Sequence, residues 1–187
     1  MILIPGFVDC HRHSWEGQLR RINPNSPTLA DYSNATHQSF AKAYRPQDMY
    51  VGNYLTAVGC IDAGITCVID NSHNARSAEH SDAAVEALMD SGVRAVHASG
   101  APQAGDWNKQ WPQDLERLQK KYFSSADQLV TLRMVGTSGR SGERAAVVTA
   151  SARSLPSLTR LTMPGGVNVA HAAAPPISAI APSPALL

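Results

Sequence analysis

The stretch Pro5-Gly6-Phe7-Val8-Asp9-Cys10-His11-Arg12-His13 carries the most information about the fold and chemistry of this chain. A Pro-Gly turn leads into a short apolar run, and the run ends in two histidines one residue apart. Because side chains alternate between the faces of a β-strand, His11 and His13 are expected on one face, about 6–7 Å apart along the strand. Two neutral imidazoles on one side can bind a divalent metal such as zinc or iron.

The same alternation predicts where the other residues of this strand point. In a barrel, the histidines face inward together with Phe7 and Asp9, and the surrounding helices cover Val8, Cys10 and Arg12. Cys10 is therefore expected to pack and not to bind the metal. Asp9 has two interpretations, as an acceptor that orients a ligand histidine or as a cap at the strand end.

Composition limits the classes of protein that fit. The 187 residues are enough for one domain, and the formal net charge of +1 gives no electrostatic reason to expect binding to nucleic acid or an acidic membrane. No apolar run reaches the ~20 residues of a membrane span. The three cysteines form no Cys-x-x-Cys pair, which favours free thiols in a reducing compartment, and we expect a cytoplasmic protein.

Helix-like and strand-like segments alternate after the first strand. Strands are predicted at 65–70, 93–98 and 129–135, and helices at 45–63, 77–91 and 112–123. The first of these helices carries a clear apolar stripe, made of Val51, Leu55, Val58 and Ile61. The connection at 14–44 is long and polar, with a short helix expected at 28–32. Such alternation indicates parallel strands, but a flavodoxin-like open sheet and a β/α barrel both produce it.

The motif Pro-Gly-Phe-Val-Asp-x-His-x-His resembles the first-strand motif of the amidohydrolase superfamily, and Trp15 and Arg20 continue the resemblance. The match is best to the branch with cytosine deaminase, guanine deaminase and the triazine hydrolases, over about residues 4–136. It implies an α/β fold in which residues 1–137 form about four βα units of a TIM-type (β/α)8 barrel. The family usually has a β-sandwich before the motif, where this sequence has four residues.

The resemblance implies a metal-dependent hydrolase that cleaves a C–N or similar bond of a cyclic or heteroaromatic small molecule, as a deaminase does. His11 and His13 would hold one divalent ion, Zn or Fe, and the substrate would contact His73, Trp15 and Arg20. For these three residues, solvation or loop packing is the alternative. The later strands provide neither an identifiable Asp nor a His-x-x-Glu, so no residue is assigned as catalytic, and His171 is the later candidate for a third ligand.

The remaining histidines are interpreted from their positions. His97, near the end of a strand, is expected to be buried and hydrogen-bonded in a structural role, with His37 and His80 at the surface. Asp70 ends a strand or begins the turn after it.

The sequence changes character at residue 138. More than half of residues 138–187 are Ala, Ser, Pro or Gly, aromatic residues are absent, and Glu143 is the single acid. We expect an irregular or disordered low-complexity tail, either genuine or the product of a shifted frame or mis-splicing. Two rival functions remain: a truncated, inactive fragment, which could form a homo-oligomer, and a phosphoesterase, which fits the motif less well.

Overall fold

The computed structural model describes residues 2–22, 25–103, 113–125, 127–135, 147–148, 160–162 and 168–170. The first half contains β1 (Phe7–Arg12), the 3-10 helix η1 (Ser14–Leu19), α1 (Leu29–Ala35), the π-helical turn η2 (Thr36–Phe40), α2 (Ala41–Ala43), α3 (Pro46–Asp62) and β2 (Ile65–Ser72). The second half contains α4 (Ala78–Ser91), β3 (Arg94–Ser99), α5 (Gln113–Tyr122), β4 (Val130–Val135) and the short strands β5 (Val147–Val148), β6 (Arg160–Thr162) and β7 (Asn168–Ala170).

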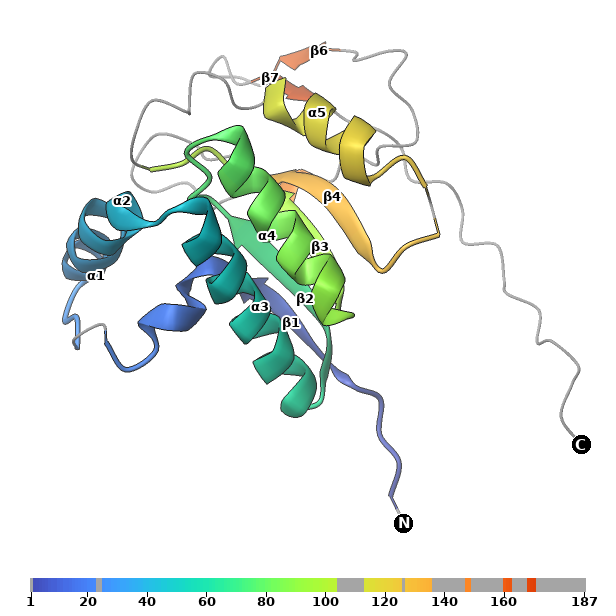
Figure 1. Cartoon of the computed structure of the whole chain (residues 1–187), viewed down its shortest axis with the longest axis horizontal. Coiled ribbons are helices and arrows are strands. Elements are labelled where there is room, and N and C mark those ends of the chain that lie inside the picture. Colours follow the sequence, from blue (N-terminus) through green and yellow to red (C-terminus); the bar gives the residue numbers. More distant parts are fainter. Residues whose placement is uncertain are drawn as a thin grey trace, which may run out of the picture.

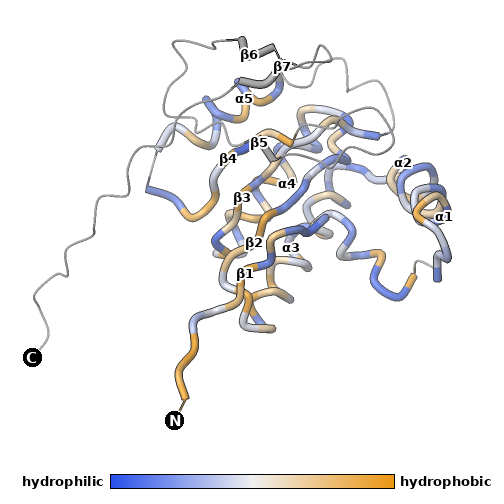
Figure 2. Tube along the Cα trace, turned by 180° about the vertical axis from the view of Figure 1, so that it is seen from behind, coloured by the Kyte–Doolittle hydropathy of each residue, from blue (hydrophilic) through white to orange (hydrophobic). Residues whose placement is uncertain are grey.

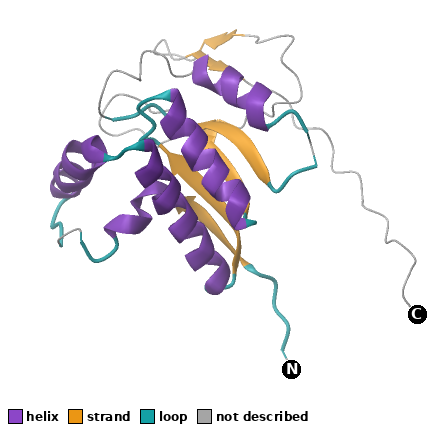
Figure 3. Cartoon of the chain, in the orientation of Figure 1, coloured by secondary structure: helices purple, strands orange, loops and turns teal. Residues whose placement is uncertain are grey.

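The sheet distinguishes the barrel from the open sheet. Strands β1 to β4 are parallel and lie in the order in which they occur in the chain, with β5 antiparallel at the far side of β4. A flavodoxin-like sheet has the order 2-1-3 at its start and helices on both faces. Here α3, α4 and α5 cover one face (Figures 1 and 3), and the strands lie on the near side when the molecule is seen from behind (Figure 2). The partial β/α barrel predicted from the sequence is confirmed.

Local sequence signals explain where the helices begin and end. Pro46 begins α3, and Asp48 closes a capping box with Arg45. The Ser77 hydroxyl caps α4 by accepting a hydrogen bond from the backbone N–H of His80, and Gly92 ends that helix with a φ of 71°. A positive φ is inexpensive for glycine, which has no Cβ. The helices and strands predicted in this region agree with the structure within two residues.

Two hydrophobic clusters hold these layers together. The larger one lies between the sheet and its helices and includes Val68, Leu88, Val93, Leu118 and Val130. The smaller one surrounds Trp15 and joins η1 to α2, α3 and α4. This second cluster fixes the segment that follows β1, and therefore the part of the chain next to the two histidines.

The apolar stripe of α3 is exposed. Val51, Leu55, Val58 and Ile61 are 42–53% exposed, whereas the buried face of α3 includes Met49, Gly52, Asn53, Ala57 and Cys60. Small residues let α3 approach η1 closely, since a Cβ at Gly52 would lie 2.3 Å from the carbonyl oxygen of Trp15. The stripe therefore points away from the layers that the structure describes.

The first strand also differs from its predicted environment. Phe7 and Val8 are 61% and 58% exposed, and Cys10 is exposed as well, so no described helix covers this strand as expected. In the described sheet β1 has one neighbour, β2, and its register with β2 shifts between Asp9 and Arg12. The prediction that Cys10 packs is therefore wrong in this structure. Arg12 is partly buried and forms an ion pair with Asp9.

The connection at 14–44 is largely helical. Residues 14–19 form η1, and residues 29–43 form α1, η2 and α2 in succession, with Thr28 as the N-cap of α1. Most of these helices could not be predicted from the sequence, because the segment is polar and no apolar periodicity marks such short helices. Apart from the short strands β5, β6 and β7, residues 138–187 lie outside the described residues, and so does His171.

Candidate metal centre

Histidines follow the carboxyl ends of two neighbouring parallel strands. His13 comes directly after β1, and His73 comes directly after β2. Because parallel strands end at the same edge of a sheet, the two rings meet there, with Nε2 of His73 2.8 Å from Nδ1 of His13 and the ring centroids 4.4 Å apart. This edge is where a β/α barrel carries its chemistry.

His11 and His13 converge although the strand ends between them. Their Nε2 atoms lie 3.3 Å apart, and the rings stand edge to face. Two nitrogens that each lie 2.0–2.1 Å from one tetrahedral ion are about 3.3–3.4 Å apart. The spacing of these two nitrogens therefore fits a shared zinc-type ion.

A backbone carbonyl fixes the orientation of the His13 ring. The carbonyl oxygen of Asn71 lies 2.9 Å from Nδ1 of His13 and can only accept, so Nδ1–H is assigned as the donor. Neutral His13 then keeps its lone pair on Nε2, the atom that faces His11. Metal-binding histidines commonly donate their other ring N–H in this manner.

His37 and His73 lie beside this pair and are largely buried. Their exposed fractions are 5% and 9%, and their ring centroids are 4.9 Å apart. Burial, together with the neighbouring His13, lowers the pKa of His37 to about 4. Burial lowers the pKa of His73 to about 3, with His13 and His37 acting in the same direction. Both rings are therefore neutral at physiological pH, as a metal ligand must be.

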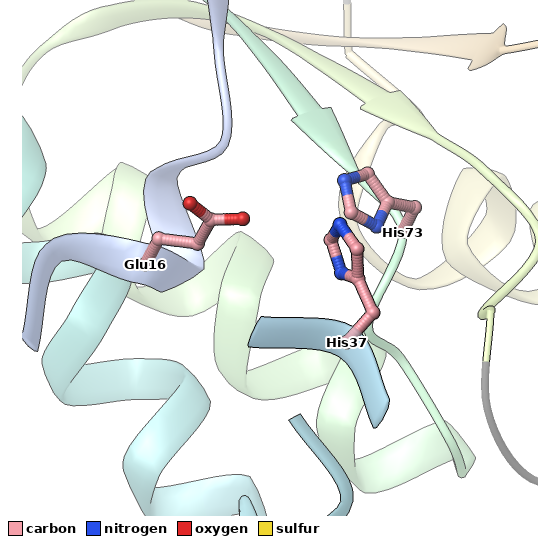
Figure 4. Close-up of side chains that lie close together, drawn as sticks. All are labelled: Glu16, His37 and His73. Carbon is pink, nitrogen blue, oxygen red and sulfur yellow. The ribbon is translucent and has the colours of Figure 1, made fainter. Parts of the chain in front are cut away.

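A carboxylate completes the group. Glu16 on η1 accepts a 2.6 Å hydrogen bond from the Tyr32 hydroxyl. Burial raises the pKa of Glu16, while the Tyr32 bond and His13 oppose that change. Figure 4 shows Glu16, His37 and His73 facing one another from three segments of the chain, and one potential ligand atom from each lies within 4.8 Å of the others.

The predicted substrate contacts occupy different environments. His73 joins the histidines described above. Trp15 is fully buried and packs edge-on against Tyr44 and His73, with ring centroids 5.2 and 5.9 Å away. Arg20 is exposed, and no described contact joins it to the histidines. The structure gives Trp15 a packing role, and the substrate contacts of these residues stay predictions.

Other polar residues near this edge make structural contacts with neighbouring protein groups. His97, 1% exposed, donates from Nδ1 to Asp70 at 3.1 Å, so its predicted structural role agrees with the structure. Asp70 lies inside β2 and also accepts from the backbone N–H of Ser14 at 3.0 Å. Asp9 accepts from the backbone N–H of His11 and pairs with Arg12, so in this structure it contacts no ligand ring.

Known proteins match part of the chain. No protein-family profile matches it. A 5-methylthioadenosine/S-adenosylhomocysteine deaminase from Thermococcus kodakarensis is 31% identical over 105 residues, which make up 56% of this chain and 23% of that protein. A deaminase of the same name from Syntrophomonas wolfei is 29% identical over 133 residues, 71% of this chain and 29% of that protein. The chain spans about a quarter of the length of these curated relatives.

Solved structures show the same fold. Guanine deaminase from Bradyrhizobium japonicum superposes with a TM-score of 0.52 at 20% identity, over 69% of this chain and 28% of that one. An atrazine chlorohydrolase mutant from Arthrobacter aurescens, complexed with zinc and atraton, gives a TM-score of 0.50 at 18% identity, over 70% of this chain and 34% of that one. The chain is similar to amidohydrolases over part of their length. The resemblance inferred from its first strand is confirmed.

Two histidines of this amidohydrolase-like chain were misplaced from sequence. His37 and His80 were expected at the surface, but their exposed fractions are 5% and 8%. His80 bonds the Tyr44 carbonyl and the cap residue Ser77, and His37 lies against Trp15 and Tyr32. His37 lies in η2, in a polar segment where no periodic pattern signals burial, whereas His80 lies in the first turn of α4. The one available signal for His37 was its place in the long connection that follows the histidine pair.

A hollow of about 400 Å³ between α3 and α4 is lined partly by Glu79, Asp82 and Glu86 and contains none of the predicted site residues. Among the described helices, none has both the length and the apolar character needed to cross a lipid bilayer.

Proposed function

We propose that this chain contributes the metal-binding edge of a hydrolase that cleaves a C–N or similar bond of a cyclic or heteroaromatic small molecule, as deaminases do. The observation that carries the proposal is the 3.3 Å separation of the His11 and His13 Nε2 atoms, with His13 oriented by the Asn71 carbonyl. The curated relatives are deaminases, which supports this reaction class.

In the proposed site each residue has a limited role. His11 and His13 hold one divalent ion, zinc or iron, and Asn71 keeps the proton of His13 on Nδ1. A divalent ion in such a site acts as a Lewis acid and lowers the pKa of water toward neutrality. The neutral rings of His37 and His73, with Trp15 behind them, give this edge an aromatic wall suited to a flat heterocycle.

The proposal also includes a location and partners. The substrate is a small molecule that reaches the strand ends, the protein works in the cytoplasm, and neither nucleic acid nor membrane takes part. Residues 1–137 act as the barrel-forming region, and residues 138–187 form a separate tail.

A second candidate function is an inactive fragment. The described residues supply two ligands from β1 and the position after it, whereas hydrolytic zinc sites have about three protein ligands. The exposed stripe of α3 supports a form that associates with itself.

Metal content and ammonia release distinguish the hydrolase from the inactive fragment. Purified chain should hold one zinc or iron ion at His11 and His13, so His11→Ala/His13→Ala should hold one ion fewer than the wild type, with His80→Ala as the control for removing a buried histidine. Ammonia release from guanine or 5-methylthioadenosine above that of the double variant supports the hydrolase. Metal binding without turnover on purines and triazines supports the fragment, and a folded chain without metal at His11 and His13 overturns the hydrolase.

A further inference from the structure

Glu16, His37 and His73 form a second group of potential ligands, which we call the carboxylate–histidine cluster. The residues come from η1, from η2 and from the position after β2, so the cluster joins three segments that are far apart in the sequence. One potential ligand atom from each lies within 4.8 Å of the other two, and the side chains face one another in Figure 4.

The donor set of the cluster suits a transition metal. Two imidazoles and one carboxylate bind zinc, and they also bind ferrous iron. Around a tetrahedral ion the ligand atoms are about 3.3 Å apart. Since the ligand atoms lie within 4.8 Å of one another, no separation has to shorten by more than about 1.5 Å, a change within the reach of side-chain rotation.

An independent observation points to a missing partner at this place. Nδ1 of His73 is completely buried and has no hydrogen-bond partner among the described residues. A buried polar atom without a partner costs about 1–3 kcal/mol. An ion bound by the cluster would give this nitrogen the partner it lacks.

The surroundings hold the cluster in place before any ion arrives. The Tyr32 hydroxyl orients the Glu16 carboxylate, and Trp15 packs against both imidazoles, with ring centroids 5.9 Å away in each case. Hydrogen bonds to the ligands from a second layer are typical of metal sites in proteins. His37 sits in the π-helical turn η2, a rare conformation that often marks functional positions.

We propose that Glu16, His37 and His73 bind a divalent transition metal of the zinc type, at a site separate from His11 and His13. The ion fastens the helical segment 29–43 to the carboxyl edge of the sheet, since His37 is the ligand from that segment. This proposal does not depend on hydrolase activity, and no ligand is shared between the two sites.

The two sites are coupled through one proton. Ligation through Nδ1 of His73 requires the ring proton on Nε2, and Nε2 lies 2.8 Å from Nδ1 of His13. When His13 also carries its proton on Nδ1 to donate to Asn71, two N–H groups face each other across this contact, so the cluster binds its ion more weakly in the wild type. Removing the His13 ring therefore frees His73 to bind an ion through Nδ1.

The experiment uses the full chain with His11→Ala/His13→Ala, which isolates the cluster. Calorimetric titration with Zn²⁺ should show one bound ion, and Zn²⁺ should raise the Tm of this variant. Adding His37→Ala should abolish both effects, whereas adding His80→Ala should leave them unchanged. Adding Glu16→Gln, which keeps an oxygen for the Tyr32 hydroxyl, should weaken Zn²⁺ binding at least tenfold even if the His37 variant unfolds.

The outcomes separate this proposal from the proposed function. A His11→Ala/His13→Ala variant that is folded by circular dichroism yet binds no Zn²⁺ overturns the second site and leaves the first intact. A wild-type chain whose ion survives in that variant and is lost with His37→Ala or Glu16→Gln supports the second site and removes the basis for the first. Two ions in the wild type and one in the variant support both.

Discussion

At the level of single residues, Asp70 links the sheet to the candidate site. It is completely buried, accepts from His97 and from the backbone N–H of Ser14, and so holds the residue next to His13. Asp70→Ala leaves both donors buried without a partner, and we expect the free energy of unfolding to fall by about 3 kcal/mol. Urea denaturation measures this, and the exposed Asp62→Ala should change stability by less than about 0.5 kcal/mol. Equal effects of the two substitutions would contradict this role of Asp70.

The pKa values of His37 and His73 predict a pH dependence of stability in the metal-free chain. Both lie below the value of about 6.5 expected in the unfolded chain, at about 4 and about 3, so the unfolded chain takes up protons first. The free energy of unfolding should be highest above about pH 7 and fall between about pH 6.5 and 4, by up to about 1.4 kcal/mol per pH unit for each histidine.

Chemical denaturation with chelator present, at pH 7 and pH 5, tests this dependence. The His37→Asn/His73→Asn variant cannot take up these protons, so its stability should change much less over the same interval. His80→Asn removes another buried histidine whose pKa burial lowers, so it should reduce the dependence by less than the double variant does. If wild type and double variant lose the same stability on acidification, other groups cause the effect.

The site residues that could be predicted from the sequence are those that lie at or just beyond the end of a predicted strand. His11 and His13 stood at the end of an apolar run, and His73 stood just beyond the second predicted strand, so topology alone brought His13 and His73 together. His37 and Glu16 were not identified because they lie on short helices in a polar segment, whose path depends on the packing of Trp15 in the smaller core. No local pattern encodes that packing.

At the level of elements, α3 contains two glycines for which substitution by alanine should change the free energy of unfolding in opposite directions. A Cβ at Gly52 would lie 2.3 Å from the Trp15 carbonyl oxygen, whereas a Cβ at Gly59 meets nothing within 4 Å. Gly52→Ala should lower the free energy of unfolding by about 1–3 kcal/mol, because η1 must move away. Gly59→Ala should raise it by about 0.5–1 kcal/mol, because alanine favours the helix. Thermal unfolding of both variants measures this, and equal signs would contradict the close packing of η1 on α3.

Element boundaries followed from local signals, but the orientation of α3 did not. Caps, glycines and β-branched runs act within a few residues, and they placed the helices and strands correctly. The stripe from Val51 to Ile61 had the spacing of a buried face, yet it is exposed because smaller residues on the other side allow α3 to approach η1. Which side of a helix is buried depends on partners that its own sequence does not contain.

For the whole molecule, the exposed stripe and the unpaired side of β1 predict self-association. Leu55 and Val58 are 53% and 42% exposed. Burying one such side chain contributes about 1.5–3 kcal/mol, so Leu55→Lys/Val58→Lys should weaken association tenfold or more. Light scattering over a concentration series measures the mass, and Ala30→Lys/Ala43→Lys, at exposed positions on α1 and α2, adds the same charge elsewhere as a control. A mass that stays monomeric in the wild type would rule out association through this face.

Sequential strand order has a consequence for how the chain reaches its native state. Each of β2, β3 and β4 pairs with the strand that precedes it in the chain, so every new unit meets a neighbour that has already been made. Pairing between consecutive units allows them to dock one after another as they leave the ribosome. The histidine-bearing edge is therefore assembled once the second strand has docked on the first.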